Sequence, residues 1–139
     1  MPKPYELLEH TADIAIRVKG GDLKEIFSKT AGAIFDIMAE DKGDAGAAPE
    51  KTEIKQSAGD LQELFVNWLN ELLSLSAANG IIFYDFRIGR LDENNIVSTV
   101  FGRSMKGYKV NLEIKAATYH QLKIEKTGSG WQAEVIFDV

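Results

Sequence analysis

A polar segment near the end of the chain carries side chains suited to chemistry. Residues 115–120 read Lys-Ala-Ala-Thr-Tyr-His, inside a stretch that otherwise alternates like a β-strand. If residues 110–124 formed one regular strand, His120 would point into the core and Lys115 to the surface. Such a strand would be unusually long, and a bulge at 116–118 would re-aim both side chains, as bulges do near functional sites. A buried, hydrogen-bonded histidine beside a surface lysine stays open as the simpler alternative.

A second candidate site consists of carboxylates from the two ends of the chain. Asp138 precedes the final residue, so its carboxylate and the main-chain carboxylate of Val139 lie within one residue of each other. Asp13, just before a predicted strand, offers a third oxygen donor. Converging carboxylates favour magnesium, manganese or calcium, which prefer oxygen ligands. Like charges held together repel unless a cation intervenes.

The alternative is that each aspartate caps a strand end in water, because nothing local connects residues so far apart in the sequence. His10, three residues before Asp13, would extend the site as a ligand or a hydrogen-bond partner. It could equally bond a neighbouring turn. The sequence has no P-loop, dinucleotide fingerprint, HExxH or GxSxG motif, so it lacks these local signatures of an enzyme.

Composition limits the class of protein. The 139 residues fit one domain, which we place at residues 1–139, and 45% are hydrophobic, as in an ordinary soluble globular protein. The absence of cysteine suits a reducing cytoplasm. No apolar run is long enough to span a membrane, and the first residues lack the apolar core of a signal peptide. With a net charge of −5, we expect contact with RNA only through a partner.

Two helices are predicted from capping boxes followed by apolar residues at helical spacing. The first begins after Asp22, with Glu25 reaching back, and its stripe runs to Met38. The second begins after Asp60 and ends at Gly80. Residues 40–49 between them are small, charged and aperiodic, and predict a mobile loop.

Strands are predicted where apolar and polar residues alternate between turn residues. The predicted strands cover residues 14–18, a short edge strand at 52–56, a hairpin at 81–91 and 96–101, a strand from 108, and a final pair turning at 127–130. This order predicts an α+β fold, a mostly antiparallel sheet with both helices packed on one face. The far face would be more polar and available to a partner.

Three separated parts of the chain together resemble the archease family. They are residues 5–14 (Tyr-Glu-Leu-Leu-Glu-His-Thr-Ala-Asp-Ile), residues 67–73 (Asn-Trp-Leu-Asn-Glu-Leu-Leu), and the closing segments 115–120 and 135–139. The resemblance implies a small cytoplasmic protein that assists the GTP-dependent, RtcB-class tRNA-splicing RNA ligase. It implies promotion of guanylylation of the ligase's active-site histidine, multiple turnover, and a broader choice of nucleoside triphosphate.

The resemblance also implies site residues. The family binds a divalent metal, seen as calcium, through positions that correspond here to Asp13, Asp138 and Val139, and it depends on a lysine that corresponds to Lys115. One segment departs from the family pattern: Gly102-Arg103 stands where Gly-Glu is expected, and Lys106-Gly107-Tyr108-Lys109 replaces a histidine-containing approach. No further acidic or histidine contribution is therefore expected from that segment.

Two other functional classes fit the same residues. One is a free-standing divalent-metal-dependent phosphoester hydrolase that uses the carboxylates directly. The other is an adaptor that binds a partner through the exposed sheet face, with a metal that is only structural.

Overall fold

The computed structural model describes residues 3–8, 13–43 and 48–139. The elements of these ranges, in chain order, are β1 (Glu6–Leu8), β2 (Ile14–Gly20), α1 (Leu23–Met38), β3 (Ala39–Asp41), β4 (Glu50–Ser57), α2 (Leu61–Asn79), β5 (Ile81–Leu91), β6 (Asn95–Ser104), the 3-10 helix η1 (Met105–Gly107), β7 (Tyr108–Val110), β8 (Ala116–Ala117), β9 (Lys123–Thr127) and β10 (Gly130–Asp138). Neither of the two long helices, within these ranges, is long and apolar enough to cross a membrane.

Both helices begin where the sequence predicts. The Asp22 carboxylate accepts a hydrogen bond from the Glu25 amide at 2.9 Å, and Asp60 accepts from the Glu63 amide at 2.8 Å. Each bond satisfies one of the amides that a helix start leaves without a partner. Gly80 ends α2 in the left-handed conformation, with φ of 62°, which glycine adopts without steric cost. The predicted capping boxes and stop signal are confirmed.

The strands form antiparallel sheets. Sheet A has the order β1-β2-β10-β8, with β9 also paired to β10; sheet B is the pair β3-β7; sheet C has the order β4-β6-β5. The α+β class with a mostly antiparallel arrangement is therefore confirmed, as is the edge position of the strand predicted at 52–56.

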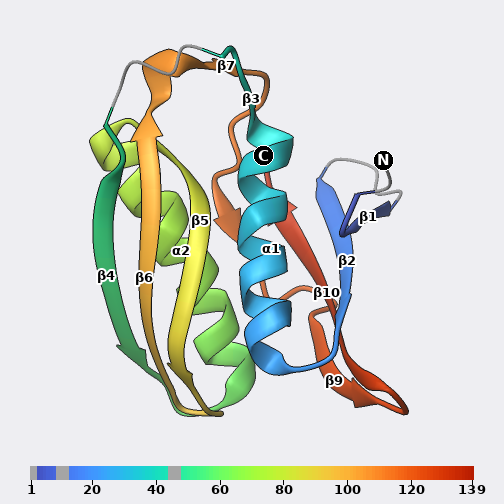
Figure 1. Cartoon of the computed structure of the whole chain (residues 1–139). Helices are drawn as coiled ribbons and strands as arrows, with labels where there is room; N and C mark the ends of the chain where they lie inside the picture. The colour runs from blue at the N-terminus through green and yellow to red at the C-terminus, as the bar shows by residue number, and fades with distance from the viewer. Residues whose placement is uncertain (1–2, 9–12, 44–47) are drawn as a thin grey trace.

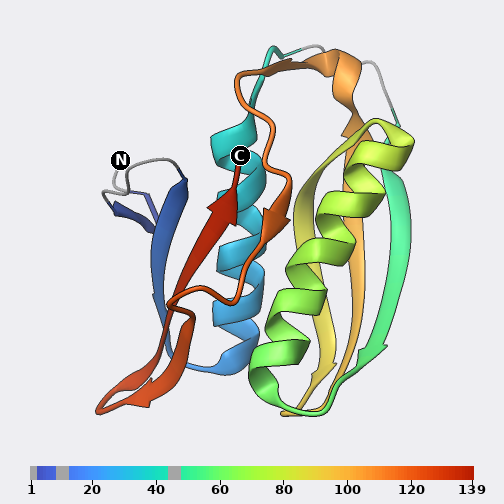
Figure 2. The ribbon, with the colours of Figure 1, turned by 180° about the vertical axis from the view of Figure 1, so that it is seen from behind.

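The two helices do not share one sheet face as the sequence led us to expect. Figures 1 and 2 show two layers: α1 lies beside β5 and covers sheet A, while α2 lies beside β8 and covers sheet C. Periodicity fixes which side of a helix is buried, but the partner of that side depends on long-range strand pairing. Here β2 pairs with β10 rather than with a strand next to it in sequence, so the strands divide among separate sheets.

The core lies between these layers. Trp68, Phe27 and Phe65 are fully buried, and the ring centroids of Phe27 and Phe65 are 5.1 Å apart with an edge-on geometry. The Trp68 indole N–H donates to the Phe27 carbonyl at 3.1 Å. The two helical stripes predicted from the sequence meet at this contact, and the only polar atom of the indole is satisfied there.

Part of the predicted loop at 40–49 is ordered. Glu40 and Asp41 belong to β3, which pairs with β7, and Gly43 donates its amide to the Asp41 carboxylate at 2.8 Å. Residues 44–47 lie outside the described residues. The prediction of a loop throughout 40–49 is wrong at its start, because the pairing partner lies some seventy residues away and leaves no local pattern.

The long strand considered for residues 110–124 is broken into pieces. After β7, the amides of Asn111 and Leu112 donate to the Met38 carbonyl at the end of α1, so the chain leaves sheet B there. It rejoins sheet A only at β8 and, after a turn, at β9. Pairing first with β3 and then at two separate places with β10 requires these breaks, which alternation alone does not predict.

Candidate functional site

The antiparallel pairing of β2 and β10 ends close to the predicted carboxylate residues, at one end of these two strands, which we call the carboxylate edge. Along β2 and β10 the cross-strand partners run from Gly20 with Trp131 to Ile14 with Phe137. If this register continued by one residue beyond the paired strands, Asp13 would stand opposite Asp138. On the other side of β10, the main-chain amide of Lys115 donates to the Asp138 carbonyl at 2.9 Å. The last paired residue of β2 and the Lys115 amide therefore flank the end of β10 on its two sides.

Alternation along β10 assigns a face to Asp138. Val135 and Phe137 are buried in the core, so Glu134, Ile136 and Asp138 lie on the other side, which we call the outer face of sheet A. The cross-strand partners of Ile136 and Glu134 on this face are Ala15 and Arg17. A continued register would add Asp13 to the same face, which is what its parity with Arg17 in the sequence predicts.

The chemistry of this donor set suits a hard divalent cation. Cross-strand partners in antiparallel strands have Cα atoms about 4.5–5.5 Å apart, and like charges placed opposite each other destabilise a sheet. Asp138 and Val139 are exposed and Asp13 is half-buried. Among the described residues, no group of three or more His, Cys, Asp or Glu residues is placed to hold a metal. The predicted ligand set is not a group of this kind, because it combines two aspartate side chains with the main-chain carboxylate of Val139.

The contact of Lys115 with β10 is made by its main-chain amide, which donates to the Asp138 carbonyl. The residue is exposed, and it lines a cavity of about 440 Å³ beside α2, together with Glu113, Met38 and Leu73. The side chain is therefore on the surface, as predicted from the sequence.

His120 is exposed, and the interpretation of a buried histidine is wrong. It lies in a turn in which the Leu122 amide donates to the Tyr119 carbonyl at 3.2 Å, with Gln121 at φ of 51°. This turn lets the chain leave the edge of β10 after β8 and return as β9, so strand parity no longer applies at residue 120. His10 lies outside the described residues.

Asn70 holds the site in place and was not singled out by the sequence reasoning. Its side-chain oxygen accepts from the Ala117 amide at 2.7 Å, and its side-chain nitrogen donates to the Ala117 carbonyl at 3.3 Å. Thr118 adds two bonds from its amide and hydroxyl to the Ile136 carbonyl, at 3.0 and 2.8 Å. The signal that could have revealed Asn70 is a polar residue beside an otherwise apolar helical stripe.

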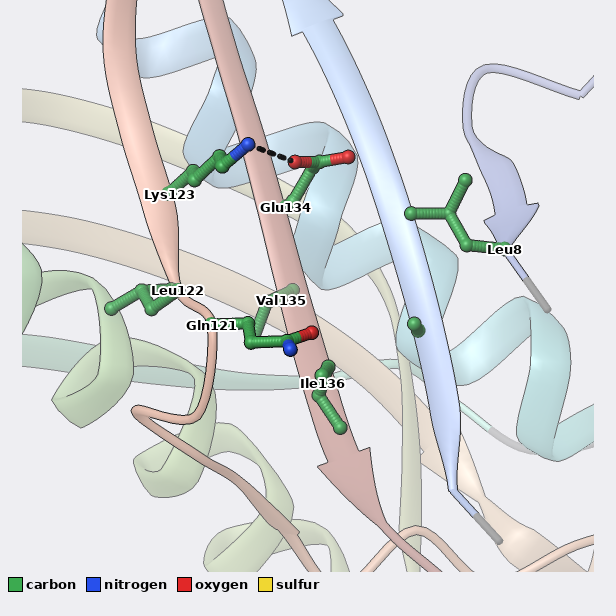
Figure 3. A pocket seen from close by; sticks show the side chains of 8 residues that line it. Leu8, Gln121, Leu122, Lys123, Glu134, Val135 and Ile136 are labelled. Carbon is green, nitrogen blue, oxygen red and sulfur yellow. Dashed lines mark ion pairs between the residues drawn. The ribbon is translucent and has the colours of Figure 1, made fainter. Parts of the chain in front are cut away.

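A cavity of about 460 Å³ lies on the outer face of sheet A (Figure 3). Ala15, Ile136 and Leu122 supply apolar lining, and Gln121 from the turn also contributes. One rim is charged, because Lys123 forms an ion pair with Glu134 at 3.5 Å. Ile136 lies between Glu134 and Asp138 on this face of β10, so the cavity is next to the carboxylate edge.

The charged rim belongs to a row of alternating charges that crosses four strands. Glu6, Arg17, Glu134 and Lys123 are successive cross-strand partners on β1, β2, β10 and β9. Arg17 donates to one Glu134 oxygen at 2.7 and 3.0 Å and contacts Glu6 at 3.3 Å. The hydrogen bonds from the Arg17 guanidinium lower the pKa of Glu134 below its ordinary value, with a smaller contribution from Lys123.

Residues 5–139 match the model of the archease protein family. A protein archease of Methanosarcina barkeri is 37% identical over 143 residues, covering 99% of this chain and 97% of the relative. A protein archease of Methanosarcina acetivorans is 38% identical over 145 residues, with the same coverage of both chains.

Two solved structures share the fold over nearly the whole chain. The solution structure of protein 1598 of Methanobacterium thermoautotrophicum has a TM-score of 0.75 and 29% identity, covering 99% of this chain and 100% of that one. The crystal structure of a Thermotoga maritima archease, described as a possible chaperone, has a TM-score of 0.67 and 27% identity, covering 100% and 98%.

The Asn70 contacts generate a prediction about stability. Replacing Asn70→Ala leaves a buried amide and carbonyl of Ala117 without partners, so we expect the free energy of unfolding to fall by about 1–3 kcal/mol. Chemical denaturation followed by circular dichroism measures this change. The control Asn111→Ala alters an exposed asparagine and should change stability by less than about 0.5 kcal/mol. Equal stability of the two variants would contradict the role given to Asn70.

The lowered pKa of Glu134 generates a prediction about acid stability. A carboxyl group whose pKa is lowered by folding adds stability above its unfolded value, here 4.5, and loses it as pH falls through the lower folded value. Glu134→Gln should therefore melt at a lower temperature than the wild type above about pH 5, with the difference shrinking toward about pH 3. Thermal melts across this range measure it, with the exposed Glu125→Gln as the control. A difference independent of pH would contradict the assignment.

Proposed function

This chain belongs to the archease family, and we propose that it activates the GTP-dependent, RtcB-class tRNA-splicing RNA ligase. In this proposal it promotes guanylylation of the ligase, sustains multiple turnover and broadens the nucleoside triphosphates that the ligase accepts. The observation that supports this most directly is the β2–β10 register, which ends with Ile14 opposite Phe137 and, if continued by one residue, would set Asp13 opposite Asp138. These are the positions at which the family resemblance places a metal.

Asp13, Asp138 and the terminal carboxylate of Val139 would hold a divalent cation in this proposal. Calcium is the ion that the resemblance implies, and magnesium or manganese would suit the same oxygen donors. When bound, the cation would supply charge neutralisation near a triphosphate, which phosphoryl-type and nucleotidyl transfer require more than new covalent chemistry.

The residues of the chain itself have three roles in the proposal. The Asp138 carboxylate gives the edge of sheet A a local negative charge, and the exposed Lys115 beside it provides a cation for a phosphate or a ligase carboxylate. Asn70 and Thr118 fix the backbone between these two residues. The adjoining cavity on the outer face of sheet A has an apolar floor suited to a side chain of a protein partner.

A protein partner is also consistent with the comparison structures. The Thermotoga maritima archease is described as a possible chaperone, and a chaperone acts on another protein. Under the proposal, the protein partner of this chain is the RNA ligase. The ligase, rather than the activator, then acts on tRNA.

The first test measures guanylylation of the ligase with GTP and manganese, with and without this protein. Wild-type protein should raise the rate, and Asp138→Asn and Lys115→Ala should each bring it back toward the rate without activator, because one loses a metal ligand and the other a phosphate-pairing cation. Asp41→Asn removes the same charge in sheet B and serves as the control.

Three outcomes would contradict the proposal in different ways. Full activation by Asp138→Asn would reduce the carboxylate edge to a structural role. Absence of activation by the wild type would remove the ligase partner. Turnover of phosphoester substrates by the purified protein alone would favour a metal-dependent hydrolase.

Metal binding gives a second, independent prediction. Calcium at about a hundredfold excess over its dissociation constant should stabilise the folded protein by about 2.7 kcal/mol, because a ligand that binds only the folded state shifts unfolding by mass action. Thermal melts with calcium or with a chelator measure this difference, which Asp138→Asn should abolish and Asp41→Asn should retain. A calcium response that survives in Asp138→Asn would contradict the assigned ligands.

A further inference from the structure

Sheet C presents a second exposed surface on the side that α2 does not cover. Ile96, Ser98 and Val100 of β6 are buried, so the alternate residues of this strand point away from the helices. Figure 1 looks onto this side of the sheet, with α2 behind it. We call it the outer face of sheet C.

The outer face of sheet C carries a net positive charge, whereas the whole chain is negatively charged. Cross-strand pairing and alternation place five basic residues on it: Lys51, Lys55, Arg87, Arg90 and Arg103. Its acidic residues are Glu53, Asp85 and Asp92, and the Asp92 carboxylate lies 4.0 Å from the Arg90 guanidinium. The balance of two positive charges on this face contrasts with the net charge of −5 for the chain, so the outer face of sheet C is basic on an acidic protein.

Two of the arginines are stacked on aromatic rings. The Arg87 guanidinium carbon lies 4.8 Å from the centre of the Phe101 ring, and that of Arg103 lies 4.6 Å from the centre of Tyr84. Asp85 accepts from the Arg87 Nε at 3.1 Å, which orients the guanidinium over the ring. Each pair forms a flat cationic platform, and its terminal guanidinium N–H groups are of the kind that donate to phosphate.

Near the other end of the same face, a row of cross-strand partners contains two basic residues and borders a cavity. Lys55, Val97 and Arg90 are cross-strand partners on β4, β6 and β5, and they line a cavity of about 300 Å³. Rows on one face of a strand repeat every two residues, about 7 Å apart. The cationic groups are therefore distributed along the strands rather than gathered at one point.

We propose that the outer face of sheet C binds a short stretch of single-stranded RNA. Phosphates would contact the arginines and lysines, and bases would stack on the Tyr84–Arg103 and Phe101–Arg87 pairs, the combination by which sheet surfaces bind single strands. A protein partner suits this face less well, because lysine is depleted from protein–protein interfaces, whereas nucleic-acid interfaces are strongly basic. The choice of RNA over DNA rests on the proposed function.

The test measures fluorescence anisotropy of a short, unstructured, labelled oligouridine with the full chain at low salt. Arg87→Glu combined with Arg103→Glu should weaken binding about tenfold or more, and the slope of log affinity against log salt should fall by about 0.7 for each phosphate that the protein no longer neutralises. Lys19→Glu combined with Lys126→Glu makes the same charge change on sheet A, including a lysine that contacts the Trp131 ring. This control should weaken binding by about twofold or less.

Stacking is tested separately from charge. Tyr84→Leu keeps an apolar side chain but removes the ring, and should weaken binding severalfold while the salt slope stays unchanged. Unchanged affinity in this variant would contradict the stacking part of the proposal. Melting temperatures of all variants establish that they are folded.

Two results would overturn the proposal as a whole. One is absence of RNA binding by the wild type at low salt, or equal reductions of affinity in the arginine and lysine double variants. The other is an arginine double variant that keeps RNA binding but no longer binds the ligase, which would assign the face to a protein partner. The anisotropy assay contains no ligase and the guanylylation assay contains no RNA, so failure of this proposal is distinguishable from failure of the proposed function.

Discussion

The antiparallel pairing of β2 with β10 is the interaction on which the rest of the structure depends. It joins the first long strand of the chain to the last one, across more than a hundred residues. Its core side buries Ile16, Val18 and Val135 against α1 and neighbouring elements, and its outer side aligns Arg17 with Glu134. The same register ends with Ile14 opposite Phe137, the residues next to Asp13 and Asp138, so one set of backbone hydrogen bonds both closes the fold and positions the strands that carry the candidate site.

The helix α2 connects this pairing to the remainder of the molecule. Trp68 bonds the Phe27 carbonyl of α1, and two residues further along the helix Asn70 bonds both main-chain polar groups of Ala117. The helix thereby fixes the position of β8 against the end of β10. Buried polar groups that are fully satisfied in this way specify one arrangement of neighbouring elements, because any shift would leave a donor or acceptor without a partner.

The outer faces of sheets A and C differ in their charge, although the chain as a whole is acidic. The outer face of sheet A ends in carboxylates and contains a cavity with an apolar floor. The outer face of sheet C is basic and carries the two arginine–aromatic pairs. The two faces point in roughly opposite directions (Figures 1 and 2). A protein of this family with two such surfaces could contact a ligase through one and its RNA through the other without competition between them.

The sequence by itself determined the local features of this protein. The helix starts at Asp22 and Asp60, the stop at Gly80 and the buried helical stripes all depend on interactions within a few residues, and each was predicted correctly. Tertiary structure alone decided what depends on distant partners: the division into separate sheets, the short pairing of β3 with β7 and the exposed position of His120. Residue types marked Asp13 and Asp138 as metal-binding candidates, yet nothing local tied them together. Only the β2–β10 pairing brings the neighbouring residues Ile14 and Phe137 opposite each other, because strand pairing between distant parts of a chain is selected by the energy of the whole fold.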